Sequence, residues 1–213
     1  MSLTGTVGEV RSSPFREPPF GGMIRYALST RQARPTDLKV RMELRDATDA
    51  DLPGILAIYN DLIANSTAVY ATDAATLAER RDWMRARTER DFPVLVAIDA
   101  QGVAGFASFG DWRGSWNGYR YTVEHSVHVR GDVRARGIGR ELLEALVPRA
   151  RLLGKHVMIG GIDATNNASI RFHARLGFEP VAHFREVGHK FGRWLDLVFM
   201  QRLLGPAGEP RPH

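Results

Sequence analysis

Hydrophobic residues follow two different spacings along this chain. Apolar side chains recur at helical spacing over 52–63 and again over 137–153. Two short apolar runs, 94–98 and 103–109, are joined by the turn 99–102, which is typical of a β-hairpin. In full, the pattern predicts strands at 40–44, 94–98, 103–109, 119–129, 156–162, 178–187 and 194–202, and helices at 52–63, 76–90, 137–153 and 167–176. Hairpins and helical crossovers together predict an α/β fold of the α+β type with a mixed sheet.

The N-terminal segment differs from the rest. Residues 1–41 contain several prolines and glycines but no sustained apolar period, so we expect a poorly ordered basic extension there. One domain is predicted over 42–203, followed by a C-terminal tail at 204–213. No run approaches 18 apolar residues and the start lacks the apolar segment of a secretory signal, so we expect a cytoplasmic protein without membrane association.

Charge and cysteine content narrow the function. The 213 residues carry 29 Lys and Arg against 24 Asp and Glu, a net charge of +5. Residues 1–41 hold seven basic and three acidic residues, so the remainder is nearly neutral and nucleic-acid binding by the folded domain is disfavoured. A role for the basic segment itself stays open. The chain has no cysteine, which excludes disulfides, cysteine-ligated zinc and an acyl-cysteine intermediate.

The most informative segment is a strand that leads through an Arg- and Gly-rich loop into a helix. The strand ends at Val129, and Gly137 and Gly139 stand at the start of the helix. Unpaired backbone N–H groups at a helix start bind anions, and glycines let a ligand approach the backbone closely, so we expect a pyrophosphate site. The segment lacks both the Gly-Lys-Ser/Thr ending and the third glycine of the common nucleotide-binding motifs, which disfavours ATP and NAD. Positive charge comes from Arg130, Arg134, Arg136 and Arg140.

Two motifs carry a resemblance to a known family. The run Arg134-Ala-Arg-Gly-Ile-Gly139 resembles the pyrophosphate-binding signature of the GNAT N-acetyltransferase superfamily, and Asn166 to Phe178 is similar to its second signature. Glu124-His-Ser-Val-His-Val129 and 188–196 resemble the branch that acetylates phosphinothricin, methionine sulfone and methionine sulfoximine. The resemblance covers about 42–203. It implies a GNAT fold, a central mixed sheet flanked by helices.

The same resemblance implies an activity and a cofactor site. The expected reaction moves acetyl from acetyl-CoA directly to the α-amine of a small amino acid, in a homodimer and without a metal. Acetyl-CoA is expected to contact the strand through the backbones of Val127 and Val129, and Asn166 to bond the pantetheine amide. The full set of expected cofactor-binding residues is Val127, His128, Val129, Arg134, Ala135, Arg136, Gly137, Ile138, Gly139, Arg140 and Asn166.

Two residues are candidates for proton transfer. A free α-amine is mostly protonated at neutral pH and needs a base, for which Glu124 is the candidate; an ordinary solvent-facing strand carboxylate is the alternative. His173 is the candidate acid for the departing thiolate, because the pKa of histidine lies near 6.5. A purely structural residue on a helix surface is the alternative there.

Substrate recognition is expected from two segments. Arg113 is a candidate bidentate clamp for the substrate carboxylate. The expected substrate-binding residues are Arg113, Gly114, Ser115, Glu124, His125 and Ser126, with Trp112, Trp116 and Tyr70 as walls. A surface arginine and a buried core histidine are the alternatives for Arg113 and His125. Two other functions remain open: a non-catalytic acyl-CoA sensor and a protein N-terminal acetyltransferase.

Overall fold

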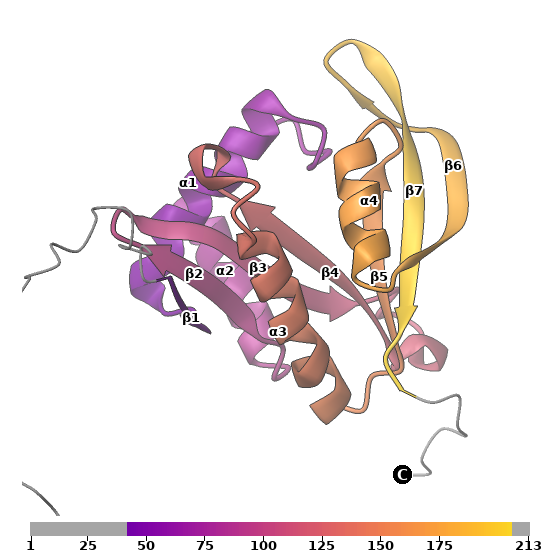
Figure 1. Ribbon diagram of the computed structural model, residues 1–213, viewed down its shortest axis with the longest axis horizontal. Helices are drawn as coiled ribbons and strands as arrows, with labels where there is room; N and C mark the ends of the chain where they lie inside the picture. Colours follow the sequence, from indigo (N-terminus) through magenta and orange to yellow (C-terminus); the bar gives the residue numbers. More distant parts are fainter. Residues whose placement is uncertain (1–41, 206–213) are drawn as a thin grey trace, which may run out of the picture. The chain divides into compact units, whose positions relative to one another are not determined.

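The computed structural model describes residues 42–205, and the predicted extension 1–41 and most of the predicted tail lie outside the described residues. The strands are β1 (Glu43–Asp46), β2 (Val94–Asp99), β3 (Gly102–Asp111), β4 (Thr122–Val129), β5 (Val157–Asp163), β6 (Glu179–Lys190) and β7 (Arg193–Leu203). The helices are α1 (Leu52–Asn65), α2 (Leu77–Thr88), α3 (Ile138–Leu152) and α4 (Asn167–Arg175). Figure 1 shows their arrangement.

The strands form one sheet in the order β1-β2-β3-β4-β5-β7-β6. Neighbouring strands are antiparallel except β4 and β5, which are parallel. A parallel pair needs a long crossover, and α3 supplies it. The predicted mixed sheet flanked by helices is therefore confirmed.

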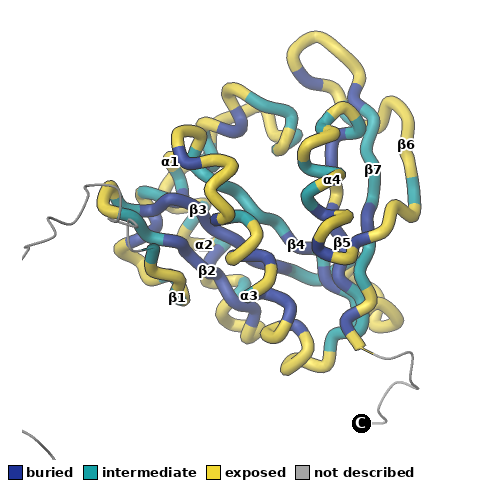
Figure 2. Tube along the Cα trace, in the orientation of Figure 1, coloured by how far each residue is buried: buried dark blue, intermediate teal, exposed yellow. Residues whose placement is uncertain are grey.

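Two apolar clusters hold the helices to the two faces of the sheet. Leu52, Ile55 and Leu62 of α1 pack with Met84 of α2 and with Phe106 of β3 in one cluster. The other cluster joins the sheet to α3 and to the inward side of α4. Figure 2 shows the buried backbone concentrated along the central strands between these layers.

The parallel pair separates soon after it forms. Residues of β4 pair with β5 only from Thr122 to Glu124, although β4 continues to Val129. Figure 1 shows the two strands diverging beyond this paired end. The ladder between β3 and β4 has no shift from Asp111↔Val123 to Gly105↔Val129, so no bulge interrupts the alternation of side chains along β4.

Two predicted boundaries are wrong. The strand predicted at 40–44 continues to Asp46, because pairing with β2 extends it, and residues 40 and 41 lie outside the described residues. The strand predicted from 119 begins at Thr122, since Asn117–Tyr119 form a 3₁₀ turn. Within 42–205, no helix is long and apolar enough to cross a membrane.

Candidate active site

The backbone of β4 faces β5 at alternate residues. Arg130 N–H donates to Ala104 O (2.8 Å) and Trp112 N–H donates to Thr122 O (3.2 Å), so the even-numbered residues of this register bond to β3. In an antiparallel ladder the residues between them turn their N–H and C=O groups to the opposite edge. Val127 and Val129 therefore point their backbones into the gap beyond the paired part of β5. An extended ligand can add there as a strand does.

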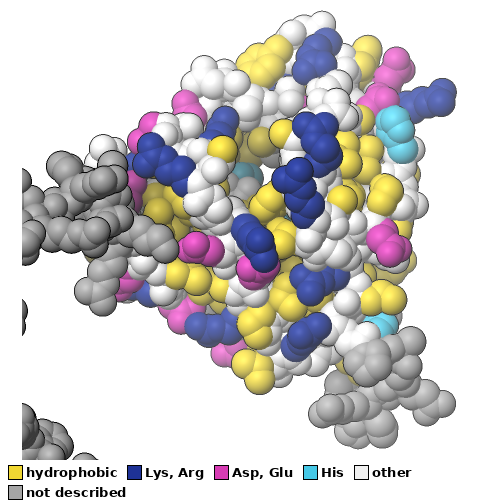
Figure 3. Space-filling model, viewed as in Figure 1, with side chains coloured by type: hydrophobic (Ala, Val, Ile, Leu, Met, Phe, Trp, Pro, Cys, Tyr) yellow, Lys and Arg dark blue, Asp and Glu magenta, His cyan; other side chains and the backbone are white. Residues whose placement is uncertain are grey.

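A cavity of about 990 Å³ opens beside this edge, and we call it the α3 cavity. Every residue predicted to bind a cofactor lines it except Arg136. The side chain of Arg136 instead donates to Asp132 O at 3.4 Å. Figure 3 shows a hollow in this face with Lys and Arg side chains on both sides.

The start of α3 presents free donors to the α3 cavity. Gly137 is the N-cap residue with φ 90°, a left-handed conformation that favours glycine. Glu141 N–H makes the first bond of the helix, to Gly137 O at 3.1 Å. The N–H groups of Ile138, Gly139 and Arg140 thus precede the first bonded turn and are suited to an anion.

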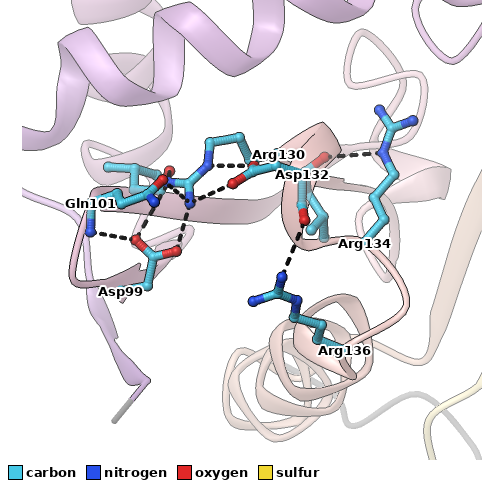
Figure 4. Close-up of polar contacts among 8 residues, drawn as sticks. Asp99, Gln101, Arg130, Asp132, Arg134 and Arg136 are labelled. Atoms are coloured by element: carbon cyan, nitrogen blue, oxygen red, sulfur yellow. Dashed lines mark hydrogen bonds and ion pairs between the residues drawn. The ribbon is translucent and has the colours of Figure 1, made fainter. Parts of the chain in front are cut away.

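The four arginines of this loop are not equivalent. Arg130 lies between two carboxylates, with Nη2 2.6 Å from Asp99 Oδ2 and Nε 2.7 Å from Asp132 Oδ1. These bonds raise the pKa of Arg130, and Figure 4 shows them bracing the loop against the β2–β3 turn. Arg140 pairs with Glu144 at 2.9 Å. Much of the positive charge expected to meet an anion is therefore already neutralised.

A second cavity of about 450 Å³ adjoins the first, and we call it the α2 cavity. Both cavities share residues of β4 and α4, among them Val127, His128 and Asn166. The second cavity is lined by Tyr59, Ala68, Val69, Arg80, Trp83, Arg87, Phe106, Gly110, Asp111, Glu124, His125, Ser126, Val127, His128, Gly161, Ile162, Asp163, Asn166, Ser169 and His173. A ligand in the first cavity can reach the second across β4.

Glu124 lies in the α2 cavity at the point where β4 and β5 separate. It stands directly opposite Gly110 of β3, and a Cβ built on Gly110 would lie 3.5 Å from Arg87 Nη2. Since opposed residues of a ladder share a face, Glu124 points to the side of the sheet that α2 covers. Burial raises the pKa of Glu124 above the usual value, which makes the carboxylate a stronger base.

Two histidines stack on the face of the sheet opposite Glu124. The rings of His125 and His173 have centroids 5.1 Å apart, and burial lowers the pKa of each. His173 Nδ1 lies 2.8 Å from Ser169 O and must donate its proton to that carbonyl. In the neutral ring Nε2 then carries no proton. The geometry therefore argues against His173 as the acid.

Arg113, the predicted clamp for the substrate carboxylate, lies outside both cavities. Arg113, Gly114 and Ser115 line neither cavity. The guanidinium of Arg113 lies 5.9 Å from the Trp116 ring centroid, and Trp116 is 60% exposed. Tyr70 donates from its hydroxyl to the carbonyl oxygen of Asp196 and also lines neither cavity. The role given to Arg113 stays a prediction.

Several residues of the α2 cavity were missed from sequence. Arg80, Trp83 and Arg87 recur at helical spacing on α2, in phase with the buried Met84. Their spacing relative to Met84 is the sequence feature that could have identified them. It is easily overlooked because α2 carries many other charged residues that face solvent. Among residues 42–205, no group of three or more His, Asp or Glu is placed to hold a metal.

Comparisons with known proteins agree with this geometry. The profile of the Acetyltransferase (GNAT) family matches residues 55–178. An L-methionine sulfoximine/L-methionine sulfone acetyltransferase of Pseudomonas paraeruginosa is 55% identical over 165 residues, which is 77% of this chain and 95% of that protein. A phosphinothricin N-acetyltransferase of Streptomyces coelicolor is 33% identical, over 76% of this chain and 96% of that protein. The yncA structure from Salmonella typhimurium, with its cofactor acetyl-CoA, has a TM-score of 0.78 and 45% identity, covering 81% and 99% of the two chains.

Proposed function

Because the chain belongs to the GNAT family of acetyltransferases, we propose that it moves acetyl from acetyl-CoA to the α-amine of a small amino acid. Methionine sulfone and methionine sulfoximine are the first candidates, since relatives at 46–55% identity carry those names. Phosphinothricin comes next, from relatives near 33%. The observation that carries the proposal is Glu124, which lines the α2 cavity at the point where β4 leaves β5.

In this proposal the α3 cavity holds the coenzyme. The donors at the start of α3 face the pyrophosphate, and Gly139 lets it approach the helix. Val127 and Val129 offer backbone groups to the extended pantetheine arm. Asn166 uses its Oδ1 to accept from Ser169 N–H at 3.0 Å, so its Nδ2 is the atom left to donate to a pantetheine carbonyl.

Glu124 is the proposed base. An α-amine must lose a proton before it can attack the thioester carbonyl, and a carboxylate of raised pKa accepts it more readily than an exposed one. A backbone N–H of β4 in the gap polarises that carbonyl by donating to its oxygen. Since CoA thiolate is a tolerable leaving group, the reaction needs no acid from His173.

The direct test is thiol release from acetyl-CoA with and without methionine sulfone. We expect release to depend on the amino acid and to saturate with it. Coenzyme binding without stimulation by any amino acid would contradict the proposal and support the acyl-CoA sensor. Stimulation by peptide N-termini alone would support the protein acetyltransferase.

Two further parts of the proposal concern context. We infer a homodimer, supported by apolar side chains exposed on the β6–β7 hairpin, where Val187, Phe191 and Trp194 are each more than half exposed. Sedimentation of the purified protein tests it, and a monomer at micromolar concentration would contradict it. The cytoplasmic location stays a prediction.

A further inference from the structure

Two arginines of α2 turn into the α2 cavity without an acidic partner. Arg80 and Arg87 make no ion pair among the described residues, whereas their neighbours Arg81 and Arg85 do. The Nε atoms of Arg80 and Arg87 are buried and have no hydrogen-bond partner. Both side chains are partly buried, and a cation withdrawn from water without a counter-charge is costly, so such a pair in a cavity favours a ligand that compensates it.

An aromatic side chain separates the two guanidiniums. The Cζ atoms of Arg80 and Arg87 lie 5.0 and 4.6 Å from the Trp83 ring centroid, and Arg80 also lies 4.0 Å over Tyr59. The rings fix the orientation of both forks by cation–π contact. Burial lowers the pKa of Arg87 to about 10, which still leaves the side chain charged at neutral pH.

The acidic residues that line the α2 cavity do not act as counter-charges for Arg80 and Arg87. Asp111 forms ion pairs with Arg90 and with Lys155 (3.6 Å), so it is already neutralised. Asp163 accepts from the hydroxyl of Thr165 on the opposite side, from β5. Among residues 42–205, Glu124 forms no hydrogen bond or ion pair with either guanidinium, and as the proposed base it must stay available to the amine.

We propose that Arg80 and Arg87 bind an oxygen-rich group of the amino-acid substrate and so set specificity, an inference that rests on the proposed function. The group is the α-carboxylate or the oxygen-bearing end of the side chain, a sulfonyl, sulfoximine or phosphinate. Both offer two or more acceptors to a guanidinium fork. Arg87 lies beside Gly110, opposite Glu124, so it holds this group while the amine faces the base.

The test compares Arg87→Met and Arg80→Met with Arg81→Met, an exposed arginine of the same helix. We expect KM for methionine sulfone to rise about 10- to 100-fold in the first two, since hydrogen bonds to charged groups are worth that much. KM for acetyl-CoA and the Arg81→Met values should stay within about twofold. Arg87→Lys keeps the charge but loses the fork, and covers the case in which Arg87→Met does not fold.

Two analogues identify the group that is bound. If it is the α-carboxylate, the effect of Arg87→Met disappears with methionine sulfone carboxamide; if it is the sulfonyl group, it disappears with methionine. An unchanged KM in both variants, or an equal loss with all three compounds, would overturn the inference.

A binding titration separates this inference from the proposed function. Methionine sulfone is titrated calorimetrically into protein saturated with CoA. Weaker binding to Arg87→Met without any turnover by the wild type would support the inference and contradict the function. Turnover by the wild type, together with equal binding to the wild type and to Arg87→Met, would support the function and contradict the inference. No binding to the wild type would overturn both.

Discussion

The two cavities that meet at β4 are built from different parts of the chain. Ten of the 21 residues that line the α3 cavity come from one stretch, 127–140, and the groups there suited to a ligand are backbone N–H donors. The α2 cavity is lined by side chains from Tyr59 to His173, on helices of both layers and on three strands. A backbone site is specified by local sequence, whereas a side-chain site exists only after packing.

This difference predicts where substitutions act. Changes in the α2 cavity should affect the amino acid and the chemical step, and changes in the α3 cavity should affect the coenzyme. Within the α3 cavity, backbone conformation should matter more than the charge of an exposed arginine.

The largest effect is expected from Glu124→Gln. An amide accepts no proton, so kcat should fall about 10²- to 10⁴-fold while coenzyme affinity is unchanged. Burial raises the pKa of Glu124, so in the wild type the base form, and with it turnover, is lost as pH falls through that raised pKa. The variant should lack this acidic limb in its pH–rate profile. Full activity between pH 6 and 9 would contradict the assignment.

Lys190→Met should have the second-largest effect on activity. Lys190 is 3% exposed and its Nζ donates to Ser66 O (2.8 Å) and Val69 O (2.6 Å), which pins the loop after α1 over both cavities. Without it two carbonyls lose a charged donor, so we expect KM for the amino acid to rise about 10-fold and Tm to fall by roughly 5–10 °C. Arg193→Met, exposed on the same hairpin, is the control and should change neither. An unchanged KM with a lower Tm would limit Lys190 to stability.

Gly137→Ala tests the backbone of the α3 cavity. No atom lies within 4 Å of the added Cβ, so the change acts through the left-handed φ of 90°, at a cost of about 1–2 kcal/mol. We expect coenzyme affinity to fall several-fold by calorimetry. Arg140→Gln, which loses only the exposed pair with Glu144, should stay within about threefold. The reverse order would show that side-chain charge dominates this cavity.

His173→Phe should have the smallest effect on turnover. The Nδ1 proton is committed to the Ser169 carbonyl and the ring is neutral, so kcat should fall less than about threefold. The check is kcat from thiol release, measured at pH values above the optimum. A loss of 100-fold together with a shifted alkaline limb would restore the acid role.

The sequence alone determined the order of the elements, the helix that begins after Gly137 and the strand that carries Glu124. Gly137 and the donors that follow it are set by the conformation of adjacent residues, and the uninterrupted alternation along β4 puts Glu124, Ser126 and His128 on one face. Short-range geometry of this kind leaves a pattern in the chain. The edge strand β1 ends later than predicted because its extent depends on pairing with β2.

Only the tertiary structure decided which charges meet a ligand. Arg130, in the Arg- and Gly-rich loop, is neutralised by Asp99, a residue 31 positions away. Arg80 and Arg87, in a helix whose charge pattern is typical of a solvent-facing surface, line a cavity and form no ion pair among residues 42–205. Lys190 donates a hydrogen bond to the carbonyl of Val69, which lies 121 positions before it in the chain. Whether a charge is free depends on partners distant in sequence, and such partners leave no local pattern.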